Sequence, residues 1–572
     1  MSSKRIAIVS VASVVLLAMV VAVSVGVSKG RSGHSSGSTE EISPSYKAIT
    51  SICQPTDYKD ACVSELTAAA GSNTTDPKDL VKIAFKVAIN EIHKVLNHST
   101  LLQEGAKDSR TKQALDNCGE LMDYAIADLQ KSIEHVGTID LSNIEELVDD
   151  VKTWLSSSVT YQETCLDGFE NTTGNVGEKM RSIMKTAGEL TSNALAIVDQ
   201  VSSVFTSLDV QFLKNRRLMS TPDVGEDGFP SWVSGGKRRL LSVPTTSIVP
   251  DIVVAKDGSG QFTTISDALD AVPKVRNGTF VIYVKAGVYE EYLQINRTLS
   301  HLMLMGDGPT QTKITGNKNF IDGTPTFKTS TVAVIAEGFI ARDIGFENSA
   351  GAEKHQAVAL RVGADMAIFY NCQMDGYQDT LYAHTNRQFY RDCTISGTID
   401  FIFGDSIAVF QNCKIVVRKP LDNQQNICTA QGRKDRREPT ILVLQNCTIT
   451  ADPEYYPLRN KLPTFLGRPW KEYSRTIIMQ SYLDDLVQPA GWMEWMGNFG
   501  LNTLFYSEFD NRGPGSSTAS RVKWRGIKSL STDHATKFTA DKLFLGARWV
   551  KQSGVPYTGG LLPLSSADGA TH

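Results

Sequence analysis

The sequence predicts an all-β parallel solenoid preceded by an all-α helical bundle. A short motif ending in Asn or Asp followed by Cys recurs in the C-terminal half, with intervals of 21, 20 and 34 residues between its cysteines. Repeats of about 20 to 25 residues with short β-branched runs are typical of parallel β-solenoids. Residues 46–205 instead place apolar side chains at helical intervals, which is typical of packed amphipathic helices. The 572 residues therefore divide into at least two domains.

The charge balance argues against a nucleic-acid-binding protein. The chain has 58 Lys and Arg against 62 Asp and Glu, which gives a formal net charge of −4. Residues 242–572 are close to neutral, with 34 basic against 32 acidic side chains. Neither part of the chain has the basic excess that binding to phosphate backbones requires.

The N-terminus carries an apolar export segment. Two basic residues precede Ile6–Val27, which has 22 residues and no charge. This length can span a bilayer, and the preceding positive charges favour a cytoplasmic N-terminus. We therefore interpret residues 1–28 as a signal anchor in preference to a cleaved signal peptide. A Gly- and Ser-rich flexible linker is expected at 29–45.

An export segment places the rest of the chain in the secretory lumen, and the cysteine and sequon content agrees. Nine cysteines in an exported chain predict disulfides plus one leftover thiol. No Cys-X-X-Cys pair is present, which argues against a zinc ribbon or redox motif. The six Asn-X-Ser/Thr sequons are candidate glycosylation sites: Asn73, Asn97, Asn171, Asn277, Asn296 and Asn446.

The helical region at 46–205 is expected to form an up-and-down four-helix bundle without catalytic residues. Cys53 and Cys62 are close enough for a disulfide across a local loop. Cys118 and Cys165 lie on two different predicted helices and would join them. The four apolar stripes run over 81–95, 115–129, 144–155 and 183–201.

Residues 206–247 are expected to be a linker, because they are rich in Gly, Pro and Ser. The linker contains two basic pairs, each followed by two apolar residues, and the second is Arg238-Arg239-Leu240-Leu241. Basic pairs between two domains of an exported protein are candidate sites for a lumenal processing protease. We expect cleavage after Leu241.

The solenoid at 248–572 brings two carboxylates together by its repeat length. Asp379 and Asp400 are 21 residues apart, and Gln356 and Gln378 are 22 residues apart. Residues one coil apart stack on neighbouring strands about 4.8 Å from each other. The spacing therefore predicts a pair of carboxylates on one face of the solenoid, which is a candidate active site. By the same spacing Cys393 and Cys413 form the best candidate disulfide, and the remaining cysteines of this region are expected to be buried thiols.

Five ordered motifs in this region resemble the signature blocks of plant pectin methylesterases. The resemblance covers residues 250–563 almost continuously, and the helical region, with its Tyr161–Phe169 segment, is similar to the inhibitor-like pro-region of these enzymes. It implies a right-handed parallel β-helix that needs no cofactor or metal and hydrolyses the C6 methyl esters of homogalacturonan in the plant cell wall. The motifs are 287–291, 355–360, 376–382, 400–404 and 466–470.

The resemblance implies a role for each candidate site residue. Asp400 is expected to be the nucleophile, and Asp379 the general acid and then the base. Arg468 is expected to hold Asp400 ionised through a charge-assisted hydrogen bond. The amides of Gln356 and Gln378 are expected to converge on the developing oxyanion.

Aromatic residues are candidates for stacking on sugar rings. Trp470 is the first choice because it follows Arg468 by two residues, and Trp492 and Tyr377 are further candidates. Thr326 matches a family position that contacts substrate.

The inhibitor-like region is expected to restrain the enzyme until the linker is cut, or else to assist folding or retention in the secretory pathway. The expected partners are pectin, the processing protease and a separate proteinaceous inhibitor. The mature enzyme is expected in the cell wall, after a membrane-anchored zymogen stage.

Three other readings of the acid pair remain open. Paired carboxylates also serve glycosidases, and solenoids also carry lyases, so a pectin depolymerase is one alternative. A calcium site would use Asp375 and Asp405 as additional ligands. A non-catalytic inhibitor or binding protein is the third alternative.

Overall fold

The computed structural model describes residues 43–71, 74–97, 108–137, 144–212, 248–276 and 278–564. The expected signal anchor, the basic pair at Arg238-Arg239 and the sequons at Asn73 and Asn277 lie outside these residues. Among the described helices, none combines the length and the apolar composition that a membrane crossing requires.

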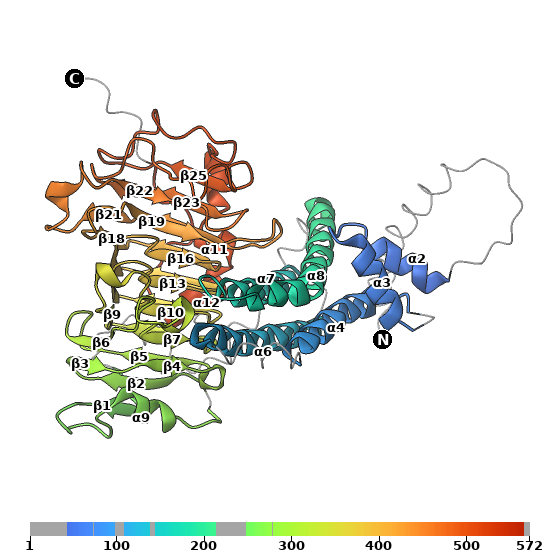
Figure 1. Cartoon of the computed structure of the whole chain (residues 1–572), viewed down its shortest axis with the longest axis horizontal. Helices are drawn as coiled ribbons and strands as arrows, with labels where there is room; N and C mark the ends of the chain where they lie inside the picture. Colours follow the sequence, from blue (N-terminus) through green and yellow to red (C-terminus); the bar gives the residue numbers. More distant parts are fainter. Residues whose placement is uncertain are drawn as a thin grey trace, which may run out of the picture. The chain divides into compact units, whose positions relative to one another are not determined.

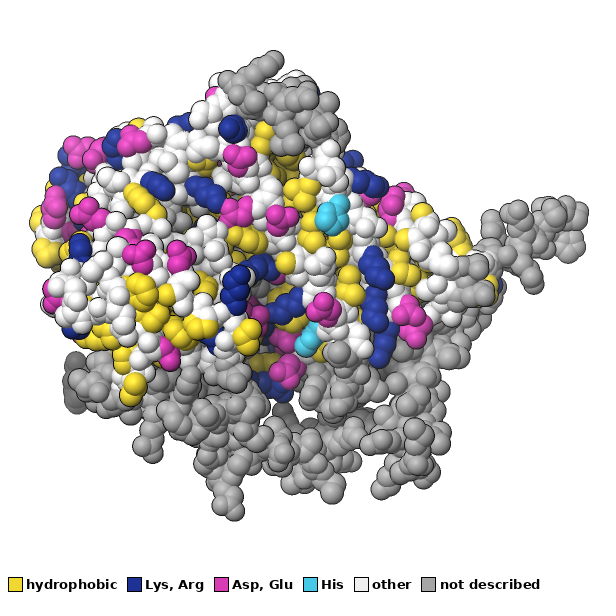
Figure 2. Space-filling model, turned by 90° about the horizontal axis from the view of Figure 1, so that it is seen from below, with side chains coloured by type: hydrophobic (Ala, Val, Ile, Leu, Met, Phe, Trp, Pro, Cys, Tyr) yellow, Lys and Arg dark blue, Asp and Glu magenta, His cyan; other side chains and the backbone are white. Residues whose placement is uncertain are grey.

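The chain divides into two compact units. The helical unit comprises Met1–Glu104, Gly119–Gln162 and Gly174–Asn215, and the β-helix unit comprises Gly105–Cys118, Glu163–Thr173 and Arg216–His572. The β-helix unit therefore includes two short stretches of the predicted helical region, Gly105–Cys118 and Glu163–Thr173, and we call the second the 163–173 segment. Basic and acidic side chains are interspersed on the face shown in Figure 2, in agreement with the near-neutral charge.

The predicted amphipathic helices are confirmed, and each predicted stripe falls on one long helix. In the helical unit α4 packs against α8, and α3 packs against both (Figure 1). Helix α8 continues to Phe212, past residue 205 where we expected the linker to begin. The helices are α2 (Pro44–Ile52), α3 (Lys59–Ala69), α4 (Pro77–Leu96), α6 (Ser109–Gly137), α7 (Ile144–Asp167) and α8 (Val176–Phe212).

Both expected disulfides of the helical sequence are present. Cys53 pairs with Cys62 across the turn between α2 and α3, and Cys118 of α6 pairs with Cys165 of α7. The second disulfide lies in the β-helix unit and ties the 163–173 segment to the start of α6.

The predicted solenoid is confirmed as a parallel β-helix of three sheets (Figure 1). Each complete coil contributes one strand to each sheet, so that residues one repeat apart become neighbours in the same sheet. Short β-branched runs suit this arrangement because their side chains fill a narrow interior on one side and pack outward on the other.

Within the described residues the sheets have ten, seven and eight strands. The ten-stranded sheet contains β1 (Ile252–Val254), β2 (Phe280–Val284), β5 (Leu302–Met305), β8 (Ile340–Arg342), β11 (Ala367–Tyr370), β14 (Arg387–Arg391), β17 (Ile407–Gln411), β20 (Ile441–Gln445), β23 (Arg475–Met479) and β25 (Phe505–Phe509). The seven-stranded sheet contains β4 (Leu293–Ile295), β7 (Val332–Val334), β10 (Leu360–Val362), β13 (Leu381–Ala383), β16 (Ile402–Gly404), β19 (Asn426–Gln431) and β22 (Thr464–Gly467). The eight-stranded sheet contains β3 (Gly287–Glu290), β6 (Thr312–Gly316), β9 (Gly345–Asn348), β12 (Gln373–Asp375), β15 (Thr394–Gly397), β18 (Lys414–Val417), β21 (Thr448–Ala451) and β24 (Tyr482–Leu483).

Stacked side chains fill the interior of the solenoid. The rings of Phe369, Tyr390 and Phe410 lie on three consecutive coils, with centroids 5.0 and 4.5 Å apart and nearly parallel planes. All three rings are buried in a continuous apolar cluster. This regular stacking fixes the register between coils, because a slip by one residue would turn every interior side chain outward.

Short helices cover the first coil and the outside of the solenoid. Helix α9 (Ile265–Asp270) packs its apolar residues into the interior cluster next to the first strands. Near the C-terminus, the short helix α10 (Thr532–Thr536) is followed by α11 (Ala540–Leu543) and α12 (Gly546–Ser553). Helices α11 and α12 add residues to a second apolar cluster on the outer face of the ten-stranded sheet.

The recurring Asn/Asp-Cys motif marks a corner of the solenoid. Asn371, Asp392 and Asn412 have φ values of 49°, 53° and 55° and connect the ten-stranded to the eight-stranded sheet. This left-handed conformation is most accessible to Asn, Asp and Gly. The cysteine that follows each of them is buried in the interior, so the motif combines a turn with a small apolar side chain.

The predicted Cys393–Cys413 disulfide is wrong. Both thiols are free and buried, as are those of Cys372, Cys428 and Cys447. Equivalent residues on neighbouring parallel strands lie about 4.8 Å apart with their side chains pointing the same way. A disulfide needs Cβ atoms about 3.8 Å apart, so a matching register places the cysteines near each other without bonding them.

Thiol counting tests this arrangement. Alkylation of the unfolded, unreduced chain is expected to add five groups, because four of the nine cysteines form the two disulfides. Mass spectrometry of the alkylated protein reads the number directly. Three added groups would mean that a further disulfide forms in the solenoid.

The described sequons differ in exposure. Asn97, Asn171 and Asn296 are exposed. Asn446 is half-buried, and its amide donates to Asn412 at 2.8 Å and accepts from Arg512 at 3.1 Å. Attachment of a glycan to Asn446 would break these two hydrogen bonds. Asn97, Asn171 and Asn296 are exposed and are therefore the more accessible acceptor sites.

Candidate active site

Five of the candidate residues lie in the segments that precede four neighbouring strands of one sheet. Thr326 precedes β7, Gln356 precedes β10, Gln378 and Asp379 precede β13, and Asp400 precedes β16. These strands are neighbours in the seven-stranded sheet. The repeat length therefore aligns the residues along one edge of that sheet.

The two carboxylates occupy equivalent positions in the register. Leu381 pairs with Ile402, so that Asp379 and Asp400 each stand two residues before paired positions. The Asp379 backbone N–H donates to Ile399 at 3.0 Å. Both aspartates have left-handed backbone, with φ values of 65° and 50°. That conformation costs a residue with a Cβ on the order of 1 kcal/mol, and such strain is concentrated at functional sites.

Arg468 forms a two-pronged contact with Asp400. The residue follows β22 and donates from Nε to Asp400 Oδ1 at 2.9 Å and from Nη2 to Oδ2 at 2.6 Å. The guanidinium also lies over the Trp495 ring, 4.3 Å from its centroid. This pair of parallel hydrogen bonds from one planar guanidinium group, which we call the Arg468 fork, fixes the orientation of the carboxylate and stabilises its ionised form.

The environments of the two carboxylates differ. Burial and the neighbouring Asp400 charge raise the pKa of Asp379 well above its ordinary value, and Arg468 offsets this only in part. Burial also raises the pKa of Asp400, but the Arg468 guanidinium opposes this through charge and hydrogen bonds. Asp400 is therefore the more readily ionised of the pair, and Asp379 the more readily protonated.

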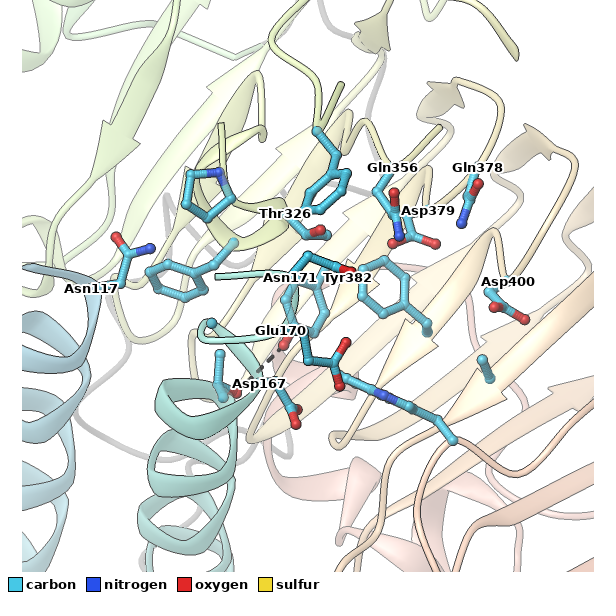
Figure 3. A pocket seen from close by; sticks show the side chains of 18 of the residues that line it. Asn117, Asp167, Glu170, Asn171, Thr326, Gln356, Gln378, Asp379, Tyr382 and Asp400 are labelled. Atoms are coloured by element: carbon cyan, nitrogen blue, oxygen red, sulfur yellow. Dashed lines mark hydrogen bonds between the residues drawn. The ribbon is translucent and has the colours of Figure 1, made fainter. Parts of the chain in front are cut away.

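A cavity of about 260 Å³ opens at these residues. Figure 3 shows Gln356, Gln378, Asp379 and Asp400 grouped on neighbouring coils, with Thr326 and Tyr382 beside them. The other β-helix residues that line it are Phe320, Pro325, Phe327, Phe403, Ala430, Arg468, Trp470 and Trp495.

All seven catalytic and substrate-binding candidates from the sequence line this cavity, but two of the aromatic candidates do not. Trp492 is 1% exposed and stacks on Tyr506 in the interior, and Tyr377 packs under Arg418 on the eight-stranded side. Asp375 and Asp405, the proposed additional calcium ligands, accept hydrogen bonds from Ser396 and Gln431 instead and do not line the cavity.

The sequence did not single out five of the aromatic residues in the cavity wall, which are Phe320, Phe327, Tyr382, Phe403 and Trp495. Tyr382 and Phe403 are paired in register on β13 and β16, with ring centroids 4.2 Å apart. Their spacing of 21 residues equals that of the two aspartates, so the repeat offered a signal that was overlooked. Trp495 lies in a loop and has no such periodic signal.

The 163–173 segment supplies the remaining wall of the cavity. Asp167, Glu170 and Asn171 line it together with Asp379 and Asp400, as Figure 3 shows. The other lining residues from helical sequence are Asn117, Thr164 and Gly168.

Polar contacts hold this segment in the β-helix unit. The Thr164 hydroxyl is 2.9 Å from His384 Nε2, and Lys471 Nζ is 2.6 Å from Asp167 Oδ1. Burial lowers the pKa of His384 well below its ordinary value, so the ring is neutral when it meets the hydroxyl. The Tyr161–Phe169 segment thus includes residues that line the cavity, a role that its sequence did not reveal.

Comparisons with known proteins agree with this architecture. The family model described as Pectinesterase matches residues 251–547, and the model described as Plant invertase/pectin methylesterase inhibitor matches residues 47–197. The putative pectinesterase/pectinesterase inhibitor 28 of Arabidopsis thaliana is 51% identical over 100% of this chain and 76% of its own length. The probable pectinesterase/pectinesterase inhibitor 21 of the same plant is 51% identical over 99% of this chain and 84% of its own.

A solved structure matches the β-helix part. The pectin methylesterase from carrot is 48% identical, with a TM-score of 0.54, and the match covers 55% of this chain and 99% of the carrot chain. The chain therefore belongs to the pectinesterase family of carboxylic ester hydrolases and carries an N-terminal region of the plant invertase/pectin methylesterase inhibitor family.

Proposed function

We propose that this cavity hydrolyses the C6 methyl esters of galacturonate units in homogalacturonan, giving pectate and methanol. The observation that carries the proposal is the acid pair, in which Asp400 is held by the Arg468 fork while Asp379 is buried beside it without such a fork. Ester hydrolysis through an acyl-enzyme needs one ionised and one protonated carboxyl group.

In the first half of the reaction Asp400 is the nucleophile. One of its oxygens attacks the ester carbonyl carbon, and a tetrahedral intermediate forms with a negative charge on the former carbonyl oxygen. As the intermediate collapses, the carbon–methoxy bond breaks and Asp379 gives its proton to the departing oxygen. Methanol leaves, and the galacturonyl group remains joined to Asp400 as an anhydride.

In the second half Asp379 is a base. It takes a proton from water, and the resulting hydroxide attacks the galacturonyl carbon of the anhydride. The bond to Asp400 breaks, the free carboxylate leaves, and both aspartates return to their initial protonation states. The switch of roles matches the raised pKa of Asp379, since a carboxyl group with a raised pKa stays protonated to higher pH and is a stronger base once it is ionised.

Two amide side chains are placed to stabilise the oxyanion. Gln356 and Gln378 precede neighbouring strands and both line the cavity. The backbone N–H of Ala357 donates to the Gln378 carbonyl at 3.2 Å, which holds the two segments side by side. Amide N–H donors fixed near the tetrahedral carbon stabilise the transition state by a few kcal/mol, of the order of 3 per donor.

The aromatic wall is suited to a sugar polymer. Trp470, Trp495, Tyr382 and Phe403 line the cavity, and Trp470 stands edge-on to Phe403 with ring centroids 5.8 Å apart. Flat apolar rings beside a few polar groups bind the apolar faces of sugar rings and orient the ester toward the acid pair. Thr326 provides a hydroxyl in the same wall.

The reaction is tested by following all the products that the competing chemistries would give. Residues 242–572 are incubated with highly methylated homogalacturonan, and methanol, reducing ends and unsaturated uronate are measured together, with and without a chelator. Release of methanol alone, unchanged by the chelator, supports the esterase. New reducing ends or unsaturated products without methanol would identify a depolymerase.

We further propose that the inhibitor-like region restrains the enzyme before processing. Asp167, Glu170 and Asn171 line the cavity that the polymer would enter, so a substrate has to displace the 163–173 segment to reach Asp400. Cleavage after Leu241 by a lumenal protease would separate the two parts, and the mature enzyme would act in the cell wall. A separate inhibitor protein of the same family would compete with pectin for the cavity.

Comparison of the full chain with residues 242–572 tests this restraint. The shorter chain is expected to release methanol at least about tenfold faster, because the cavity is free of the 163–173 segment. The carrot structure, 99% of which matches this part alone, supports independent folding of the shorter chain. Circular dichroism checks that both proteins are folded. Equal rates of methanol release per molecule would then contradict the restraint and favour a role of the inhibitor-like region in folding or retention.

A further inference from the structure

Two lysines beside the cavity meet the carboxylates of the 163–173 segment. Lys471 Nζ is 2.6 Å from Asp167 Oδ1 and 3.6 Å from Glu163 Oε2. Lys434 Nζ is 3.8 Å from the same Glu163 oxygen. All four side chains belong to the β-helix unit. None of these four residues was singled out from the sequence as part of a site.

Lys471 lies at the edge of the cavity. It follows Trp470 directly, and its Nζ is 5.3 Å from the centroid of the Trp470 ring, which lines the cavity. Its side chain is only 15% exposed. Burial lowers its pKa, but Asp167 and Glu163 outweigh this and raise the pKa overall, so that the ammonium group is charged. A buried ammonium of this kind requires an anionic partner.

The Asp167 carboxylate is an incomplete partner. Its Oδ2 is buried and makes no hydrogen bond with the described part of the chain. Burial raises the pKa of Asp167, although the Lys471 charge opposes the shift. An oxygen without a donor weakens the net stabilisation of an ion pair. The lysine therefore has a carboxylate ligand that another carboxylate can replace at little cost.

We propose that Lys471, assisted by Lys434, forms a subsite for the free carboxylate of a de-esterified galacturonate unit that flanks the ester undergoing hydrolysis. Glu163 and Asp167 occupy this subsite in the uncleaved chain as substitutes for the polymer carboxylate. This inference rests on the proposed function. A methyl-esterified unit is neutral and offers the ammonium only weak carbonyl acceptors, whereas a free carboxylate offers a charge-assisted hydrogen bond.

The subsite is tested by binding. Residues 242–572 carrying Asp400→Asn, which prevents turnover, are titrated with a galacturonate oligomer and with its fully methyl-esterified form in a calorimeter. The measured quantity is the ratio of the two affinities. Lys471→Met is expected to lower the preference for the acidic oligomer by about tenfold, the effect of one charge-assisted hydrogen bond. Added salt is expected to reduce the same preference.

Two further variants serve as controls. Lys471→Arg retains the charge and is expected to restore most of the preference. Lys285→Met removes a lysine between β2 and β3, near the start of the solenoid. This variant is expected to keep the ratio of affinities measured with Lys285 and Lys471 both in place. An unchanged ratio in Lys471→Met, or an equal loss in Lys285→Met, would overturn the proposal. Because binding is measured without turnover, failure of the proposed esterase would appear separately, as absence of methanol release.

A second measurement on the full chain covers the case in which Lys471→Met does not fold. Glu163→Gln combined with Asp167→Asn removes the substitute carboxylates while leaving the lysines intact. The full chain with these changes is expected to bind the acidic oligomer about tenfold more tightly than the unmodified full chain. Equal affinities of the two full chains would overturn the proposal.

Discussion

Replacement of Asp400 by Asn is expected to lower methanol release on the order of 10⁴-fold or more, as removal of a nucleophile does in other hydrolases that form acyl-enzymes. The amide keeps the shape of the side chain but does not attack an ester. Because burial already disfavours the charged form of Asp400, a neutral side chain is expected to leave the thermal unfolding midpoint within a few degrees. Methanol release and a melting curve on the same preparation measure both effects.

Asp375 provides a matched control for this variant. Its carboxylate stands at the end of β12 and accepts hydrogen bonds from Ser396 at 2.7 Å and Gln373 at 2.6 Å. The residue does not line the cavity. Asp375→Asn is therefore expected to retain methanol release within about threefold of the unmodified protein, since Asn has nearly the same size as Asp and keeps one acceptor oxygen for these hydrogen bonds. A comparable loss in both variants would argue that Asp400 acts through stability and not through chemistry.

Replacement of Arg468 by Met is expected to shift the acid limb of the pH profile of kcat/KM to higher pH. The reaction needs Asp400 ionised, so activity rises as the pH passes upward through its pKa. Arg468 opposes the rise of that pKa caused by burial, and its removal lets the pKa increase further. The variant therefore loses most activity at acidic pH and regains part of it as the pH is raised.

The alkaline limb of the same profile reports Asp379. Activity falls as the pH rises through its pKa, because the protonated acid that assists methanol departure is lost. Arg468 also lowers this pKa, so its removal is expected to move the alkaline limb to higher pH as well. Because the two carboxyl groups interact, the pKa values read from the two limbs describe the pair and not the separate residues. Arg459→Met, which removes an arginine paired with Asp485 outside the cavity, should leave the profile unchanged. A proportional loss at every pH in Arg468→Met would assign Arg468 to substrate binding instead.

Much of the fold and of the acid pair was predictable because both follow from one repeat length. The interval of 21 residues between Asp379 and Asp400 equals the length of a coil, so register alone brings them together. The same interval separates Tyr382 from Phe403. Helical stripes were equally reliable, because the spacing of buried residues depends only on helix geometry.

Periodicity failed where the outcome depends on side-chain direction or on distant contacts. Cys393 and Cys413 match in register, but their side chains point the same way, so they lie near each other without forming a disulfide. Trp492 and Trp495 have similar sequence surroundings, yet the first is buried in the interior and only the second reaches the cavity. The contact of Lys471 with Asp167 joins residues 304 positions apart, and no local pattern encodes a contact of that range.

The covalent role of Asp400 can be tested most directly by intercepting the acyl-enzyme with hydroxylamine. Residues 242–572 are allowed to turn over methylated homogalacturonan in the presence of hydroxylamine, and the uronyl groups are analysed by mass spectrometry. The nitrogen attacks the anhydride carbon and displaces Asp400, so the mechanism predicts galacturonyl hydroxamate together with methanol, and neither product with Asp400→Asn. Methanol release by the unmodified enzyme without hydroxamate, or equal hydroxamate from Asp400→Asn, would contradict a covalent intermediate on Asp400.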